Sequence, residues 1–489
     1  MKKKLNYVFM MFIFVFFLTE KSSLYGQNET AISPPNRTAK MAYQLAFKAY
    51  KKNLYFTSAS YMKLFLMQDG EVSVGAAKLL DAILVNTNIF PFLDIPFSVL
   101  AGVNYSKNIS FVIAKKYFFK RDYPNAIVYL RKIGPRSKYF LSAQHHLAGL
   151  YQMIGEKEQS DHFISECLKH ASKRRKTKQD IIEEKAEYIF DSCQSMRARH
   201  WYKFGSNDNA EAAFKKVPLN SYVFPQTLFE SSWSYYLKND FQRAIGKNIT
   251  FQSPILEDYF IPESELVKTL SYLELCLYED AIGVMRFFDK ETKSKVNDFM
   301  KEFNLRSGAD YPFAKLFTDK SQRLKLGDNF FNRQLNVIWT RPGFQTIKYY
   351  LQRINNEKEL IARVGTPYDR KAFALAYRDF LEFFNDFVKI KFVKMAKSII
   401  KINNIFSEIE LDVYSSIKYQ LYDEKAKVQK KVDEPEKFYV KNIKRDTRQY
   451  YWNFHGEFWA DELGSYIPYL DSRCSDKNIY MRAIKNFEK

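Results

Sequence analysis

The residues best suited to chemistry gather near the C-terminus, between Tyr450 and Leu470, where the chain reads YYWNFHGEFWADELGSYIPYL. Seven residues with aromatic, acidic or imidazole side chains lie within fifteen positions of this stretch: Trp452, His455, Glu457, Trp459, Asp461, Glu462 and Tyr466. Glu457 and Asp461 are four residues apart, so on a helix they would share a face and could act as an acid/base pair. The same residues fit a helix that docks by its aromatic face, with Gly464 as its C-terminal cap, and we favour this interpretation.

The histidines are the other candidates for catalysis or metal binding: His145, His146, His162, His170, His200 and His455. His162, Cys167 and His170 form the tightest group, but spacings of five and three do not place all of them on one helix face. A buried cysteine beside surface histidines is favoured over a metal site. The sequence also lacks a phosphate-binding loop, a dinucleotide-binding glycine pattern, a paired-histidine zinc helix and a Gly-x-Ser-x-Gly elbow. We therefore expect no enzyme activity, no cofactor and no metal.

An internal repeat organises the middle of the chain. Its units are marked by aromatic residues at successive distances of 34, 50, 34 and 37, namely Tyr117, Tyr151, Trp201, Tyr235 and Tyr272. Small residues lie three positions before these aromatics (Ala114, Ala148, Ala198, Ser232, Thr269) and nine after them (Ala126, Ser160, Ala210, Ala244, Ala281). Residues three apart share one face of a first helix, and the later small residue lets a second helix approach closely. Because one such pair cannot bury its own apolar stripe, the pattern predicts stacked helix pairs.

This spacing resembles the tetratricopeptide repeat (TPR), a 34-residue helix-turn-helix unit, in the form found in exported bacterial proteins. The resemblance covers about residues 107–290, and a weaker unit is indicated by Tyr50 and Ala59, with Phe47 where a small residue belongs. The resemblance implies an α-solenoid whose first helices line an inner, partner-binding surface. On that surface we expect three pairs of side chains, each three residues apart: Lys115 and Phe118, Arg199 and Tyr202, and Trp233 and Tyr236. Aromatic and Arg side chains commonly anchor protein interfaces, although the last pair fits equally well as packing between units.

Helical regions flank the repeats on both sides. Residues 38–106 have helical periodicity and are predicted to cap the repeats, after a flexible lead-in at residues 27–37. Residues 291–489 are expected to form a C-terminal helical region. Within it, residues 368–432 contain no Pro or Gly, which predicts one very long helix or a helical hairpin, coiled-coil-like and folded back on the solenoid. The expected fold class is all-α, a TPR-like solenoid of antiparallel helix pairs followed by this long-helix region.

Residues 1–26 have the pattern of a secretory signal peptide. Three lysines precede the apolar run Leu5–Leu18, whose 14 residues are fewer than the roughly 20 that a membrane-spanning helix needs. No cysteine lies near the expected cleavage site at Gly26, so the acceptor of a lipoprotein is missing. We expect a periplasmic or secreted protein, and an uncleaved inner-membrane anchor is the competing interpretation.

Charge and cysteine content bear on the partners and the compartment. The formal charge of +21 is spread along the chain, so nucleic acid is not an expected partner. An oxidising compartment permits disulfides among Cys167, Cys193, Cys276 and Cys474, and a bridge between the first two is one option that spacing alone does not decide.

Together these features predict a non-enzymatic protein–protein interaction scaffold of the bacterial cell envelope. Its expected partners are other envelope proteins with acidic or extended segments, and peripheral contact with membrane or peptidoglycan is compatible with its charge. The alternative is a protein that binds or cleaves peptidoglycan through the Trp-, Glu- and Asp-rich segment near the C-terminus.

Overall fold

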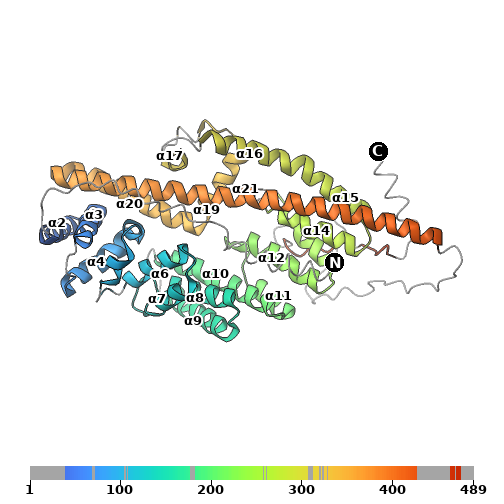
Figure 1. Ribbon diagram of the computed structural model, residues 1–489, viewed down its shortest axis with the longest axis horizontal. Coiled ribbons are helices and arrows are strands. Elements are labelled where there is room, and N and C mark those ends of the chain that lie inside the picture. Colours follow the sequence, from blue (N-terminus) through green and yellow to red (C-terminus); the bar gives the residue numbers. More distant parts are fainter. Residues whose placement is uncertain are drawn as a thin grey trace. The chain divides into compact units, whose positions relative to one another are not determined.

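The computed structural model describes residues 39–68, 72–103, 106, 108–176, 182–256, 258–259, 261–306, 312–318, 321, 324–327, 329–426, 463–468 and 470–474. All regular elements within these residues are helices, and none is a strand (Figure 1). Neighbouring helices pack as pairs, and a very long helix lies near the C-terminus. The predicted all-α fold class is confirmed. The expected signal peptide lies outside the described residues.

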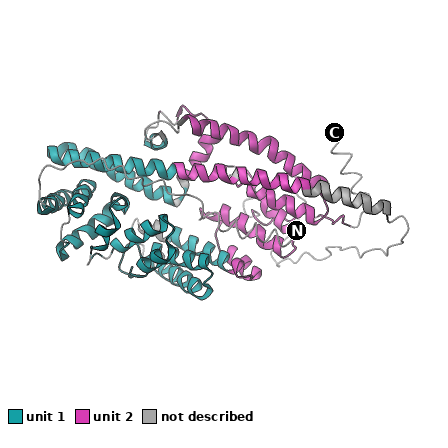
Figure 2. Cartoon of the chain, in the orientation of Figure 1, with its two compact units in different colours: residues 1–200, 313–318, 341–388 teal, residues 201–312, 319–340, 389–489 magenta. Residues whose placement is uncertain are grey.

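The chain divides into two compact units that are not continuous in sequence (Figure 2). Unit 1 comprises residues 1–200, 313–318 and 341–388, and unit 2 comprises residues 201–312, 319–340 and 389–489. Part of the region after residue 291 therefore belongs to the same unit as the N-terminal helices, which chain order alone does not indicate.

Unit 1 is built from helices of the N-terminal half and from helices that follow the repeats. They are α2 (Ala39–Lys51), α3 (Tyr55–Met67), α4 (Val74–Thr87), η1 (Phe90–Phe92), α5 (Phe97–Ala101), α6 (Ile109–Phe119), α7 (Tyr123–Arg131), α8 (Phe140–Ile154), α9 (Lys157–Lys176), most of α10 (Ile182–Lys203), most of α17 (Pro312–Thr318), α20 (Pro342–Val364) and the first part of α21 (Pro367–Ala426).

Unit 2 contains the remaining repeats and the second part of α21. Its helices are α11 (Asn207–Phe214), α12 (Phe224–Leu237), α13 (Phe241–Ile249), η2 (Thr250–Gln252), α14 (Glu263–Glu274), α15 (Tyr278–Phe287), the π-helical turn η3 (Phe288–Thr292), α16 (Lys293–Arg306) and α19 (Phe330–Thr340). The 60-residue α21 is a single helix, so the helical hairpin that the sequence also allowed does not form.

The repeat pattern corresponds to helix pairs. The five marker aromatics lie on α6, α8, α10, α12 and α14, and the small residues nine positions later lie on α7, α9, α11, α13 and α15. All ten small residues that define the pattern are at most 1% exposed. A larger side chain at these positions would hold neighbouring helices apart, so the small residues allow the close approach that the sequence predicts.

The turn inside every pair has one geometry that the sequence only partly reveals. The residue four positions after the marker aromatic has positive φ in all five units, and these residues are Arg121, Gly155, Gly205, Asn239 and Cys276. The next backbone N–H donates to the carbonyl of the aromatic, for example Asp122 to Tyr117 at 3.0 Å and Leu277 to Tyr272 at 2.9 Å. This left-handed turn ends the first helix and reverses the chain.

The pair α2–α3 repeats the same geometry with an alanine in the place of the aromatic. Asn53 has φ +62°, the N–H of Leu54 donates to the carbonyl of Ala49 at 3.0 Å, and Ala46 and Ser58 are fully buried. The sixth unit is therefore real, but its register is one residue earlier than the Tyr50 and Ala59 spacing indicated.

Helices α20 and α21 complete unit 1 by capping α3. The backbone N–H groups of Phe56 and Thr57 each donate to the carboxylate of Glu357 at 2.8 Å, and the Thr57 hydroxyl donates to it at 2.8 Å. Leu54 at the N-cap position of α3 has no side-chain acceptor, so Glu357 from α20 supplies the cap. The Asp369 carboxylate in α21 accepts from Lys52 at 3.3 Å and from the Tyr61 hydroxyl at 3.2 Å. The C-terminal helices thus fold back on the N-terminal ones within this unit.

Two disulfides cross-link the described residues, one in each unit. Cys167 of α9 pairs with Cys193 of α10, with 6.4 Å between their Cα atoms, and Cys276 pairs with Cys474 at 4.9 Å. The first is the bridge that the sequence offered as one option, and the second spans 198 residues of the chain. Among the residues described, no helix has both the length and the apolar character needed to cross a membrane.

Candidate functional site

The six residues expected on the inner surface fall into two groups. Lys115 and Phe118 on α6 and Arg199 on α10 belong to unit 1, whereas Tyr202, Trp233 and Tyr236 belong to unit 2.

The group in unit 2 packs into the protein interior. Tyr202, Trp233 and Tyr236 are only 7%, 5% and 6% exposed. The rings of Trp233 and Tyr236 meet edge to face with centroids 5.7 Å apart, and the Tyr236 hydroxyl donates to Glu274 at 3.1 Å. This burial favours the packing role that the sequence left open, and contact of these residues with a partner stays a prediction.

The group in unit 1 is partly exposed and is joined by two histidines from α8. We call Lys115, His145, His146 and Arg199 the basic inner cluster, since they come from α6, α8 and α10, the first helices of three successive pairs. The Lys115 Nζ atom lies 3.2 Å from His146 Nε2, and the two histidine rings are 5.9 Å apart. Phe118 lies beside the cluster, with its ring centroid 5.3 Å from Lys115 Nζ and 5.7 Å from the His146 ring.

Burial controls the charge of this cluster. It lowers the pKa of Lys115 to about 8. Burial, reinforced by the positive charges of Arg199 and Lys115, lowers the pKa of His145 to about 4, and burial beside Lys115 holds the pKa of His146 well below its usual value. At neutral pH both imidazoles are therefore neutral, Lys115 is charged, and His146 can accept a hydrogen bond from its ammonium group.

The charge of Lys115 is not compensated by an acidic partner within the described part of the chain. Among the residues that the structure describes, no Asp or Glu forms an ion pair with Lys115, and its hydrogen-bond partner is the neutral His146. A half-buried ammonium group of this kind gains most from a carboxylate supplied from outside, because the site has already lost part of its hydration. The arrangement can therefore bind an anionic group next to the apolar ring of Phe118.

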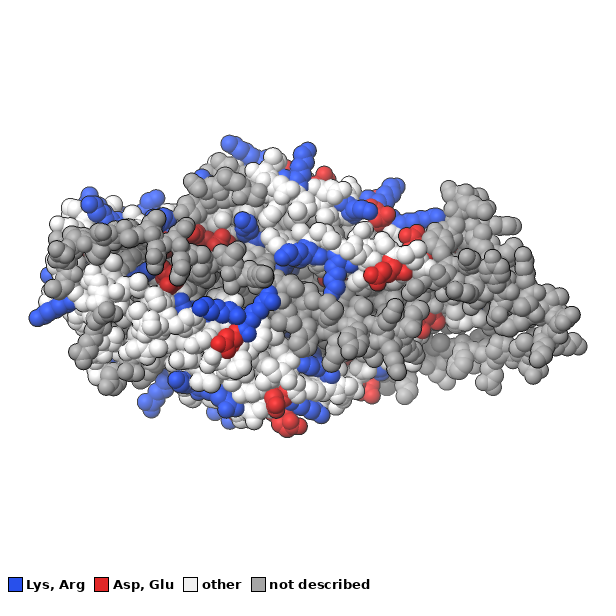
Figure 3. All heavy atoms as spheres, viewed as in Figure 1, with Lys and Arg blue, Asp and Glu red and all other residues white. Residues whose placement is uncertain are grey.

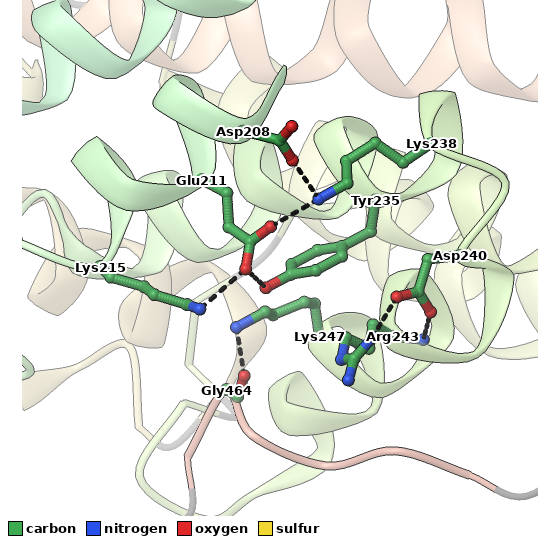
Figure 4. Close-up of polar contacts among 9 residues, drawn as sticks. All are labelled: Asp208, Glu211, Lys215, Tyr235, Lys238, Asp240, Arg243, Lys247 and Gly464. Carbon is green, nitrogen blue, oxygen red and sulfur yellow. Dashed lines mark hydrogen bonds and ion pairs between the residues drawn. The ribbon is translucent and has the colours of Figure 1, made fainter. Parts of the chain in front are cut away.

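A polar cluster in unit 2 shows the opposite situation (Figure 4). The Glu211 carboxylate accepts from Lys215 at 2.7 Å, from the Tyr235 hydroxyl at 2.7 Å and from Lys238 at 2.9 Å, and Lys238 also pairs with Asp208 at 2.7 Å. Burial raises the pKa of Glu211, but the hydrogen bonds from Lys215, Tyr235 and Lys238 outweigh it and lower that pKa to about 2. This cluster neutralises its own charges and stabilises the α11–α12 contact. On the face drawn in Figure 3, Lys and Arg side chains occur at several places, and some of them adjoin one another.

The other sequence-derived candidates do not converge on a chemical site. The sulfur of Cys167 is bonded to Cys193, and His170 lies 3.3 Å from Glu166, so the His162, Cys167 and His170 group is not assembled around a metal. Within the described part of the chain no three His, Cys, Asp or Glu side chains are placed to hold a metal ion. Trp452 to Glu462 lie outside the described residues, so the peptidoglycan alternative stays a prediction.

Sequence reasoning missed His145 and His146 as members of the site. The register of the repeat contained the necessary signal. Lys115 and Arg199 each lie two residues before a marker aromatic, and the two histidines lie six and five residues before Tyr151 on the helix between them. Aligning three adjacent first helices by their marker aromatics and comparing their basic and histidine positions would have grouped these four residues.

By its fold and its basic inner cluster, the chain is an all-helical repeat protein whose first helices carry a partly exposed cationic site. Comparison of the chain with models of known protein families gives no match, and comparison with curated protein sequences gives none either.

Proposed function

We propose that the protein is a non-enzymatic, TPR-type scaffold that binds an acidic, extended segment of another protein at the basic inner cluster. The observation that carries this proposal is the half-buried Lys115, whose hydrogen-bond partner is a neutral imidazole rather than a carboxylate. A carboxylate of the partner would supply the missing counter-charge, and Arg199 offers a planar group suited to a second one.

The shape and chemistry of the surface favour a peptide over a small anion. The cluster draws on three successive first helices, and an extended segment can contact all of them. Phe118 adds an apolar contact, with its ring 5.3 Å from the ammonium group, so the preferred segment alternates acidic and apolar residues.

We place this scaffold in the cell envelope or outside the cell. Two disulfides among the described residues support an oxidising compartment, because cytosolic thiols are kept reduced. The apolar run Leu5–Leu18 is the sequence argument for export, and it lies outside the described residues.

The test is a binding titration by fluorescence anisotropy with a labelled peptide of alternating Glu and Leu and its Gln-for-Glu counterpart. The full chain should bind the acidic peptide, and Lys115→Gln with Arg199→Gln should raise its Kd at least about tenfold. Lys132→Gln with Arg136→Gln is the matched control, since it also replaces one Lys and one Arg and removes the same two positive charges from exposed positions at and beyond the end of α7. Equal binding of both peptides, or equal losses in the cluster and control variants, would overturn the proposal.

A further inference from the structure

A segment of the chain's own C-terminal region lies along the repeats of unit 2. We call residues 463–468 and 470–474 the strap. The backbone N–H of Gly464 donates to the Thr250 hydroxyl at 3.1 Å, and Lys247 donates to the Gly464 carbonyl (Figure 4). Further along, the Gln242 amide donates to the Leu470 carbonyl at 2.7 Å, and the Arg473 N–H donates to the Leu275 carbonyl at 3.0 Å.

These four hydrogen bonds are made to the backbone of the strap and not to its side chains. Each one ends on a strap N–H or carbonyl group, and such contacts tolerate many sequences. The side chain that adds specificity is Leu470, which packs against the core cluster of Ile245, Leu275 and Leu277. The surface of α13 and the α14–α15 turn therefore has the features of a binding site for an extended peptide with one apolar anchor.

Gly246 of α13 is required by the strap and not by the helix. A Cβ atom at this position would lie 1.7 Å from the carbonyl oxygen of Tyr466 and 2.5 Å from its carbonyl carbon. Gly283 holds the equivalent position in the next repeat, two residues after the buried small residue, and a Cβ atom there would meet nothing within 4 Å. A side chain at position 246 would therefore displace the strap, whereas one at position 283 has room.

The strap is also held by a covalent bond. Cys474 at its end is exposed and pairs with Cys276, the left-handed residue of the α14–α15 turn, at φ +55°. The corresponding turn positions of two earlier repeats are Gly155 and Gly205. A reductant can therefore reach the bond that fixes the strap to the α14–α15 turn.

We propose that unit 2 carries a second peptide-binding surface, which the strap occupies while the Cys276–Cys474 disulfide is intact and leaves when a dithiol reduces it. One thiolate of the dithiol attacks a sulfur of the bridge and breaks the S–S bond. The second thiolate of the dithiol then attacks the dithiol sulfur of the mixed disulfide and releases the protein cysteine that was still bonded. Two electrons and two protons pass to Cys276 and Cys474, and the dithiol becomes a disulfide. The vacated surface takes an extended segment of a partner that places a Leu-like side chain where Leu470 lay.

Release of the strap is tested by hydrogen exchange on the full chain. In the oxidised protein the amides of Gly464 and Arg473 should be protected, and reduction by dithiothreitol should speed their exchange at least about tenfold. Gly246→Ala should do the same without reductant, and Gly283→Ala should not. Equal exchange in the oxidised, reduced and Gly246→Ala proteins would overturn the proposal, as would equal effects of the two alanine substitutions.

Occupancy by a second peptide is tested with a labelled copy of residues 463–474 that carries Cys474→Ser. Its receptor is the full chain with Leu470→Asp and Cys474→Ser, whose own strap lacks its anchor and its tether. The peptide should bind this open chain at least about tenfold more tightly than the oxidised wild type, and adding Gly246→Ala should abolish the gain. Unchanged circular dichroism would show that the variants fold. Failure to bind the open chain, or equal binding to the closed one, would overturn the proposal.

Discussion

Replacing Glu357 by Gln should destabilise unit 1 through the end of a helix far away in the sequence. The Glu357 side chain is 4% exposed and accepts three hydrogen bonds of 2.8 Å from Phe56 and Thr57 at the start of α3. A glutamine keeps one oxygen acceptor but turns an amide donor toward a backbone N–H group. One charged hydrogen bond is lost and one buried N–H is left without an acceptor, so the expected loss is about 2 to 4 kcal/mol.

The assay combines urea unfolding, followed by far-UV circular dichroism, with hydrogen exchange at the start of α3. The urea midpoint should fall, and the amides of Phe56 and Thr57 should exchange faster than in the wild type. Glu359→Gln is the matched control because Glu359 is exposed on the same helix, and its effect should stay within about 0.5 kcal/mol. If Glu357→Gln and Glu359→Gln behaved alike, the long-range cap would not stabilise the unit as reasoned.

Three further predictions follow from the charges and cross-links of unit 1. The pKa of His145 is about 4 against 6.5 in the unfolded chain, so the unfolded state binds the extra proton. In thermal unfolding His145 alone should therefore contribute a loss of stability of up to about 3 kcal/mol as pH drops from 6.5 to 4. His145→Gln should remove that share of the slope, and the share of His146 should remain. The variant Cys167→Ser with Cys193→Ser opens a cross-link between residues 26 apart and should lose about 3.5 kcal/mol in denaturant unfolding. Because the pKa of Lys115 is about 8, binding of the acidic peptide, measured by anisotropy, should weaken as pH rises through that value. Lys115→Arg should remove this pH dependence. The same pH profile of binding in the wild type and in Lys115→Arg would contradict the role of Lys115.

The helix pairs could be predicted because their signal is local and repeated. Small residues such as Ala148 and Ala244 recur at fixed distances from an aromatic, and close approach of helices leaves few other residue types acceptable there. The pair α2–α3 was misregistered by one residue because Ala49 replaces the aromatic that marks the other units.

Features that depend on distant parts of the chain could not be predicted in this way. No sequence pattern connects Glu357 with the start of α3, or Cys474 with Cys276, because contact between them arises only after folding. The left-handed turns were visible at Gly155 and Gly205 but hidden at Arg121, since a residue with a side chain adopts that conformation only when its surroundings impose it.

Only part of the candidate site could be predicted from the sequence, because the rest depends on contacts between distant residues. Lys115, Phe118 and Arg199 follow from the register of the first helices, whereas the burial of Trp233 and Tyr236 depends on side chains from neighbouring helices. The lowered pKa of Lys115 is likewise a property of the packed surroundings, not of residue type.

Peptide binding at the basic inner cluster is tested most directly by a photo-crosslink from the surface itself. The full chain with benzoylphenylalanine in place of Phe118 would be irradiated with the labelled Glu- and Leu-containing peptide, beside a chain with the same group in place of Tyr129 on α7. Crosslinking from position 118, suppressed by Lys115→Gln, is the predicted result. Equal or stronger crosslinking from position 129, or labelling that Lys115→Gln leaves unchanged, would contradict binding at the basic inner cluster.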